Sequence, residues 1–166
     1  IWITEYYTAT EYKPEKVLSY EAGFKTSIAN QLRLNGAVFD NNYKDFQARI
    51  SASATDPSDP LNIAILSVVN AGKLRIRGAE LEAAWTPLPQ LLIDAQVGYL
   101  DAKYKEFFDD RFPNKSRAFQ TPAFSPKWTL RTGAQYAVGI GSAGSVTLGG
   151  QARYRSRQAL SVDNTF

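Results

Sequence analysis

The sequence contains no cysteine, no histidine and no methionine among its 166 residues. Without cysteine or histidine there can be no disulfide framework, no zinc finger, and no catalysis by a thiol or an imidazole. We therefore predict that the protein is not an enzyme. The chain opens with Ile1-Trp2-Ile3, without an initiator methionine or a signal-peptide pattern, and we expect it to be a piece of a longer protein.

Neither sign of charge dominates the chain. Nineteen Lys and Arg residues oppose 16 Asp and Glu residues, and the two signs are interspersed. Proteins that bind nucleic acid concentrate cations on one surface, so we expect no nucleic-acid partner. The uncharged stretch 132–152 is long enough for a membrane helix, but its many glycines and polar residues disfavour one. We therefore predict no transmembrane helix.

Apolar and polar residues alternate with a period of two along most of the chain, a pattern typical of strands with one apolar face. Direct reversals join these segments in series, which predicts an all-β fold, an antiparallel meander of about six long strands. The alternation is clearest in residues 18–28, 32–38, 79–85, 91–99, 128–136 and 146–154.

Charged residues break this phase in one segment. Three cations have odd numbers like the apolar residue Leu81, and on one regular strand residues of the same parity point to the same face. These cations are Lys73, Arg75 and Arg77. Either a bulge lies near Gly78, or these charges lie beyond the apolar zone of the same face. We favour the second interpretation.

The predicted connections alternate between short and long. Short turns are expected near 29–30, 86–90 and 139–145, and long loops rich in Pro, Asp, Asn and Ser near 51–67 and 106–125. The last residues, 159–166, are also predicted to form a long loop. Every tight turn is therefore expected at one end of the strands, and every long loop at the opposite end.

The apolar face could contact either a protein core or lipid, since a soluble β-sandwich and a membrane barrel share this pattern. The segment from Lys16 to Ile28 exceeds the ordinary strand length of about 5 to 6 residues and is long enough to cross a bilayer. Long loops alternating with short turns are also typical of outer-membrane barrels. Both features favour the membrane barrel over a soluble sandwich that acts as a binding module.

Aromatic residues bracket the apolar rows. Trp128 and Tyr136 are about 26 Å apart along an extended strand, or nearer 20 Å after tilt, close to the apolar band of about 25 Å between aromatic girdles. We predict a lipid-facing girdle that contains these two residues together with Trp85 and Tyr20.

Several segments resemble the TonB-dependent outer-membrane receptors. A Lys-Pro-Glu step leads into a Tyr-Glu-x-Gly-x-Lys strand, and a Gly-x-Glu-x-Glu strand and a Pro-Lys strand entry follow in the family's order. The series covers nearly the whole chain. The similar segments are 13–26, 32–47, 77–83, 98–104, 125–128 and 154–157.

The resemblance implies a segment from the later part of a plugged barrel of about 22 strands, so that residues 1–166 form a partial barrel domain. It also implies location in the outer membrane of a Gram-negative bacterium and energy-coupled uptake of a ferric siderophore or a similar scarce nutrient. The implied partners are outer-membrane lipid, the small-molecule ligand, and TonB through an N-terminal region absent from these residues. A passive, porin-like barrel remains an alternative.

Candidate ligand-binding residues lie on the polar face. Inward-facing Arg131, Arg153 and Arg155, with Gln151 beside them, would suit an anionic ligand, because a guanidinium group binds anions through two parallel hydrogen bonds. The alternative is that these arginines pair with carboxylates of the barrel interior or the plug. Glu80 and Glu82 share this face, and we predict that they form ion pairs there.

Other polar groups are assigned to solvent or to lipid. Asp56 and Asp59, and Asp109 and Asp110 with Asn114, lack the spacing of a calcium loop, so we expect no metal site and no cofactor. Cations near the external rim could touch anionic lipid headgroups. These are Arg75, Arg77 and Arg157.

Overall fold

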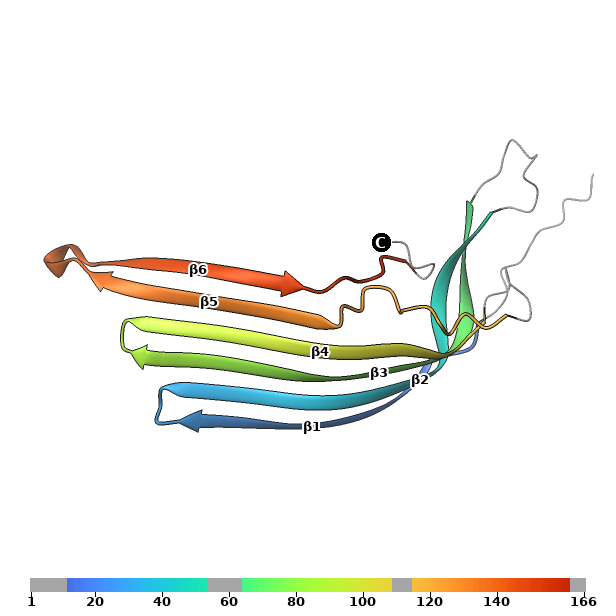
Figure 1. The fold of residues 1–166 in the computed structure, drawn as a ribbon, viewed down its shortest axis with the longest axis horizontal. Coiled ribbons are helices and arrows are strands. Elements are labelled where there is room, and N and C mark those ends of the chain that lie inside the picture. The colour runs from blue at the N-terminus through green and yellow to red at the C-terminus, as the bar shows by residue number, and fades with distance from the viewer. Residues whose placement is uncertain (1–11, 54–63, 109–114, 162–166) are drawn as a thin grey trace, which may run out of the picture.

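The computed structural model describes residues 12–53, 64–108 and 115–161, and in these ranges the chain forms one antiparallel sheet (Figure 1). The strands are adjacent in sequence order from β1 to β6, which confirms the predicted all-β meander. The sheet is open, with β1 and β6 at its edges. The elements are β1 (Lys16–Ile28), β2 (Leu32–Ser53), β3 (Ala64–Leu88), β4 (Leu91–Phe107), β5 (Trp128–Gly139), the 3-10 turn η1 (Gly141–Ala143) and β6 (Ser145–Arg155).

Tight reversals lie together at one end of the sheet, on the left in Figure 1. Between β1 and β2, Ala29 and Asn30 both have positive φ, as in the mirror-image turns that suit the twist of a hairpin. Between β5 and β6 the reversal contains η1. The β3–β4 turn is narrower than the predicted 86–90, because β3 continues through Pro87 to Leu88, which pairs with Leu91.

The strands extend further than predicted at the opposite end. β2 reaches Ser53 and β3 begins at Ala64, so both enter the stretch 51–67 that the sequence predicts as a loop. β4 ends at Phe107, inside the predicted loop 106–125. Residues 54–63, 109–114 and 162–166 lie outside the described part of the chain.

β2 and β3 bend together away from the rest of the sheet at this end (Figure 1). Their register shifts next to Asp45, which has φ 54°, and opposite Gly72, which has φ 125°. The extra residue of such a bulge bends a strand, and glycine adopts positive φ without steric cost. The side-chain amide of Asn70 donates to the Asp45 carbonyl at 2.7 Å and holds the bulge.

Among the described residues, one small cluster of buried apolar residues is found next to this bend. Tyr104 and Phe107 stack with ring centroids 4.6 Å apart, and Leu74 packs with them. The main part of the sheet, between the bend and the tight turns, contributes no residue to this cluster. Within the described ranges, little of the sheet's apolar surface is therefore covered by other parts of the chain.

The strand registers place the alternating apolar residues on one face. Leu18, Phe24 and Leu148 are 56%, 54% and 63% exposed there, and Leu130 is also exposed. All six described strands belong to one sheet, so no second sheet covers this face within the described ranges. A soluble sandwich would bury these residues under a second sheet. The described residues therefore contradict the sandwich alternative.

Among the described residues, no helix has the length and apolar character needed to cross a membrane.

Candidate functional site

The four predicted girdle residues lie on the apolar face. Trp85 is opposite Ile93, and Tyr136 is opposite Leu91, near the tight turns. Trp128 and Tyr20 lie toward the other end of the sheet. All four side chains are partly exposed, with 46% for Trp85 and Trp128, 45% for Tyr136 and 63% for Tyr20. Their role as a girdle remains a prediction.

Two further tyrosines on this face are absent from the predicted girdle. Tyr99 is the direct neighbour of Trp128, and the two ring centroids are 4.9 Å apart. Tyr154 lies opposite Leu130 and is 59% exposed. Their parity with the apolar residues of β4 and β6 is the sequence signal that could have identified them.

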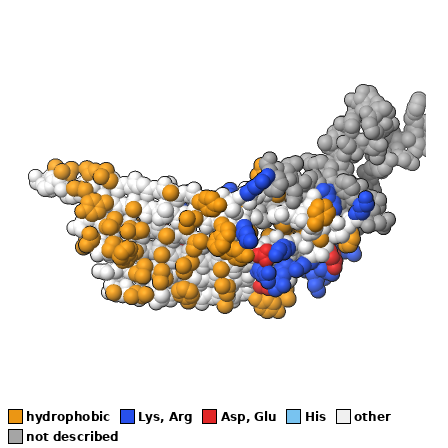
Figure 2. All heavy atoms as spheres, in the orientation of Figure 1, with side chains coloured by type: hydrophobic (Ala, Val, Ile, Leu, Met, Phe, Trp, Pro, Cys, Tyr) orange, Lys and Arg blue, Asp and Glu red, His pale blue; other side chains and the backbone are white. Residues whose placement is uncertain are grey.

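A group of charged residues lies on the same face, at the end of the sheet opposite the tight turns. It begins in the row of Tyr20, which is opposite Asp40. The β2–β3 register runs without interruption from Lys44 opposite Lys73 to Leu32 opposite Trp85, so there is no bulge at Gly78. Arg75 and Arg77 therefore share a face with Leu81, and the second interpretation of the broken phase is correct. Figure 2 shows Lys and Arg side chains gathered at one end of the hydrophobic surface.

Ion pairs link these charges outside the membrane-spanning part of the strands. Arg75 forms a bidentate ion pair with Asp40. The hydrogen bond from Arg75 lowers the pKa of the Asp40 carboxyl group. Asp101 accepts from both Lys103 and Arg77 at 2.9 Å, and hydrogen bonds from Lys103 and then Arg77 lower its pKa. Both carboxyl groups are therefore held in the ionised form.

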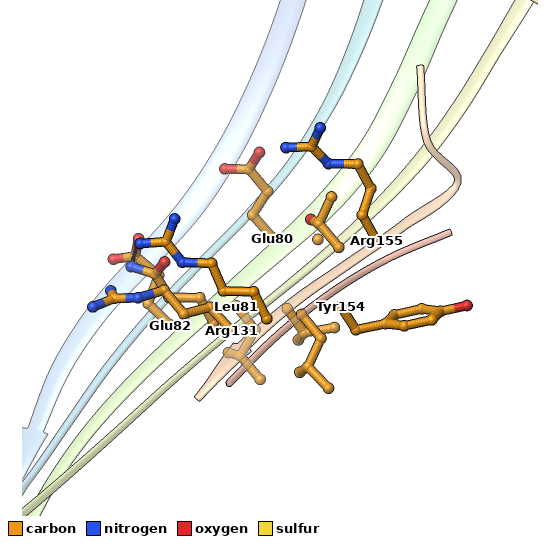
Figure 3. A pocket seen from close by; sticks show the side chains of 12 residues that line it. Glu80, Leu81, Glu82, Arg131, Tyr154 and Arg155 are labelled. Carbon is orange, nitrogen blue, oxygen red and sulfur yellow. Dashed lines mark hydrogen bonds between the residues drawn. The ribbon is translucent and has the colours of Figure 1, made fainter. Parts of the chain in front are cut away.

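The predicted arginines lie on the opposite, polar face, around a hollow of about 700 Å³. Arg131 comes from β5, and Arg153 and Arg155 come from β6. Glu80 and Glu82 of β3 form the other side of the hollow. In Figure 3 the labelled arginine and glutamate side chains extend to one side of the sheet, and the Tyr154 ring points to the other.

The arginines of this hollow have few partners. Arg131 and Arg153 are direct cross-strand neighbours, an arrangement that is unfavourable for like charges. Arg131 Nη1 lies 3.7 Å from Asp94 Oδ2, beyond hydrogen-bond distance, and its Nε is buried without a hydrogen bond. Arg153 and Arg155 form no ion pair within the part of the chain that the structure describes. Positive charge is therefore incompletely neutralised here.

Within the described ranges, Glu80 and Glu82 do not form the predicted ion pairs. Among the described residues, Glu82 instead accepts hydrogen bonds from the side-chain amides of Gln96 at 3.1 Å and Asn35 at 3.4 Å. Both amides are its cross-strand neighbours, and the arginines lie further away, on β5 and β6. The amide N–H groups satisfy the hydrogen-bonding capacity of the Glu82 carboxylate without neutralising its negative charge.

The fourth predicted ligand residue, Gln151, lies apart from the other three. It is opposite Gly133 on β5 and does not line the hollow. Sequence reasoning instead missed Gln96 and Thr129, which do line it. Both residues have the parity of the polar face. Whether they line the hollow depends on the register between strands, which the sequence did not define.

The described residues contain no group of three acidic, His or Cys residues arranged to hold a metal ion. Asp56 and Asp59, and Asp109 and Asp110 with Asn114, lie outside the described ranges. The hollow between Glu80 and Arg155 offers cations and carboxylates but no nucleophile paired with a base. Its arrangement is suited to binding charged groups.

Long strands, an exposed apolar face bounded by aromatic residues, and a charged opposite face together define a segment of a transmembrane β-barrel. The family model described as TonB dependent receptor-like, beta-barrel, matches residues 3–166. The chain therefore belongs to the TonB-dependent receptor β-barrel family. In such a barrel the apolar face contacts lipid, and the polar face lines the interior.

Solved structures of larger receptors share this fold. The ferric yersiniabactin uptake receptor FyuA from Yersinia pestis is 23% identical, with a TM-score of 0.65 over 90% of this chain and 20% of FyuA. The copper transporter OprC is 20% identical, with a TM-score of 0.62 over 86% of this chain and 18% of OprC. The FrpB iron transporter from Neisseria meningitidis is 22% identical, with a TM-score of 0.60 over 91% of this chain and 21% of FrpB. The chain thus spans about a fifth of these proteins.

Proposed function

We propose that this chain supplies six strands, from the later part of the barrel, to a receptor that imports a ferric siderophore or a similar scarce anionic nutrient. The receptor acts in the outer membrane of a Gram-negative bacterium and couples to TonB through a region outside these residues. The long connections between strands lie on the external side. The observation that carries this proposal is the group of incompletely paired arginines around the interior hollow.

The charge of the hollow supports an anionic ligand. Arg131 and Arg153 face the same space from neighbouring strands, and Arg155 adds a third guanidinium group two residues further along β6. Guanidinium groups bind carboxylates and related oxygen anions through paired hydrogen bonds. An oxygen-rich anionic metal complex would relieve the repulsion between the two adjacent arginines. No covalent chemistry is part of this proposal.

The names of the similar structures support transport of a metal in some form. FyuA is described as an uptake receptor for ferric yersiniabactin, FrpB as an iron transporter and OprC as a copper transporter. Iron bound to an organic anion is the nutrient that best matches the arginine-lined hollow of this chain.

Uptake by cells tests this proposal. Cells that produce the full-length receptor containing this chain are given a panel of radiolabelled ferric siderophores, with and without functional TonB. We expect accumulation of at least one complex, and its loss when TonB is absent. Equal uptake without TonB would indicate a passive barrel, and uptake of only an uncharged nutrient would contradict the anionic substrate class.

A further inference from the structure

Three lysines form a row on the lipid-facing surface, at the end of the sheet opposite the tight turns. Lys16 of β1 is paired with Lys44 of β2, which is paired with Lys73 of β3. Like charges directly opposite each other on neighbouring strands destabilise a sheet. The next residue in the row is Glu106 of β4, whose one ion pair among the described residues is with Lys73, at 2.6 Å. Within the described residues, Lys16 and Lys44 form no ion pair.

The adjacent rows cannot neutralise these two lysines. Asp40 is already bound by Arg75, and Asp101 is shared between Arg77 and Lys103. We call these residues, together with the row of lysines and Glu106, the charged rim. It holds six cations and three carboxylates, and each carboxylate is already engaged. Further negative charge must therefore come from outside this group.

The charged rim lies at the depth of the lipid headgroups. Tyr20 is opposite Asp40, at the inner side of the rim, and Lys16 lies at its outer side. Between them the strand advances about 13 Å, or about 9 Å along the membrane normal after tilt. The headgroup layer is about 5 to 8 Å thick on each side of the hydrocarbon. Long lysine side chains extend along apolar surface toward a polar layer. In Figure 2 the cations adjoin the hydrophobic surface directly.

We propose that the charged rim binds the phosphate groups of anionic lipids in the outer leaflet, with Lys16 and Lys44 as the main contacts. The long loops place this end of the strands on the external side. Lysine binds phosphate as a compact charge, and Arg75 and Arg77 add groups suited to phosphate oxygens. The ligand is membrane lipid because the rim shares a face with the exposed residues Leu18 and Tyr20, which in a barrel would contact acyl chains and their boundary.

Lipid binding by the purified full-length receptor tests the inference. In mild detergent, binding of fluorescent phosphatidic acid is compared with binding of the matching phosphatidylcholine. We expect a preference for phosphatidic acid that falls about fivefold for each lysine lost, and so on the order of 25-fold in the variant Lys16→Gln/Lys44→Gln. The charge-preserving variant Lys16→Arg/Lys44→Arg should keep the preference.

The matched control is Lys25→Gln, which removes a lysine from the polar face of the same strand. Circular dichroism confirms the strand content of each variant. The inference is overturned if the double Gln variant keeps the full preference, or if Lys25→Gln loses as much. It is also overturned if inorganic phosphate at the same concentration displaces the lipid, because the rim would then bind free phosphate.

Discussion

The substitution Leu130→Arg is expected to destabilise the full-length barrel by about 2 kcal/mol in a bilayer. Leu130 lies on the apolar face of β5, between Val97 and Tyr154. It is two residues inside the girdle position Trp128, about halfway from that position to the middle of the apolar band, so we expect a cost at the lower end of the range for the midplane. Arginine at the midplane of a lipid-facing barrel surface costs about 2 to 4 kcal/mol, and the cost falls toward the interfaces.

Gln135→Arg is the matched control for this prediction. Gln135 lies on the polar face of the same strand, opposite Gly149, where an added arginine remains in the wet interior. We expect a cost of less than about 1 kcal/mol. Equilibrium unfolding of the refolded receptor in lipid vesicles by guanidinium chloride measures both values. Equal costs for the two substitutions would contradict the assignment of the faces.

Loss of the neighbouring arginines in the hollow should weaken ligand uptake strongly. A hydrogen bond to a charged group contributes about 1.5 to 3 kcal/mol, or roughly tenfold to a hundredfold in affinity. We therefore expect Arg131→Gln/Arg153→Gln to raise the ligand concentration for half-maximal uptake on the order of a hundredfold. Because Arg131 forms only a 3.7 Å pair with Asp94, the stability of the barrel should change little.

Arg33→Gln controls for a general loss of positive charge. Arg33 lies on the polar face of β2, opposite Ala84, and does not line the hollow. Its loss should leave uptake unchanged. If the double variant instead lowers stability and leaves uptake unchanged, the arginines pair with carboxylates elsewhere in the receptor and do not bind the ligand.

The two faces of the sheet could be predicted from the sequence because side chains alternate along every strand. Parity alone placed Leu18 with Phe24, and Trp128 with Tyr136, and the structure confirms both placements. For Arg75 and Arg77 the same argument left two interpretations, a bulge near Gly78 or charges beyond the apolar zone of this face, and the uninterrupted β2–β3 register excludes the bulge. Parity is a local property, so neither turn geometry nor long-range pairing can change it unless a bulge intervenes.

Contacts between strands could not be predicted in the same way, because they depend on register. Glu82 was expected to pair with cations, but the register places Asn35 and Gln96 beside it. The row formed by Lys16, Lys44 and Lys73 also exists only because three strands align in this register. Register depends on turn length and on bulges such as those at Asp45 and Gly72, which single-strand periodicity does not report.

The extended ends of β2 and β3 were missed for a related reason. Their outer segments lie beyond the apolar band, so the alternation that identifies a strand weakens there. Pairing between the two strands continues to Ser53 and Ala64, and it depends on backbone hydrogen bonds that do not require an apolar face.

Cysteine accessibility along β5 tests the central claim most directly. The chain contains no cysteine, so single substitutions at each position from Trp128 to Val138 introduce one thiol at a time into this segment. In the full-length receptor in membranes, a water-soluble maleimide should label residues of odd number, from Thr129 to Ala137, and a lipid-soluble maleimide those of even number. Labelling without this alternation, or with the opposite phase, would contradict a barrel segment whose apolar face contacts lipid.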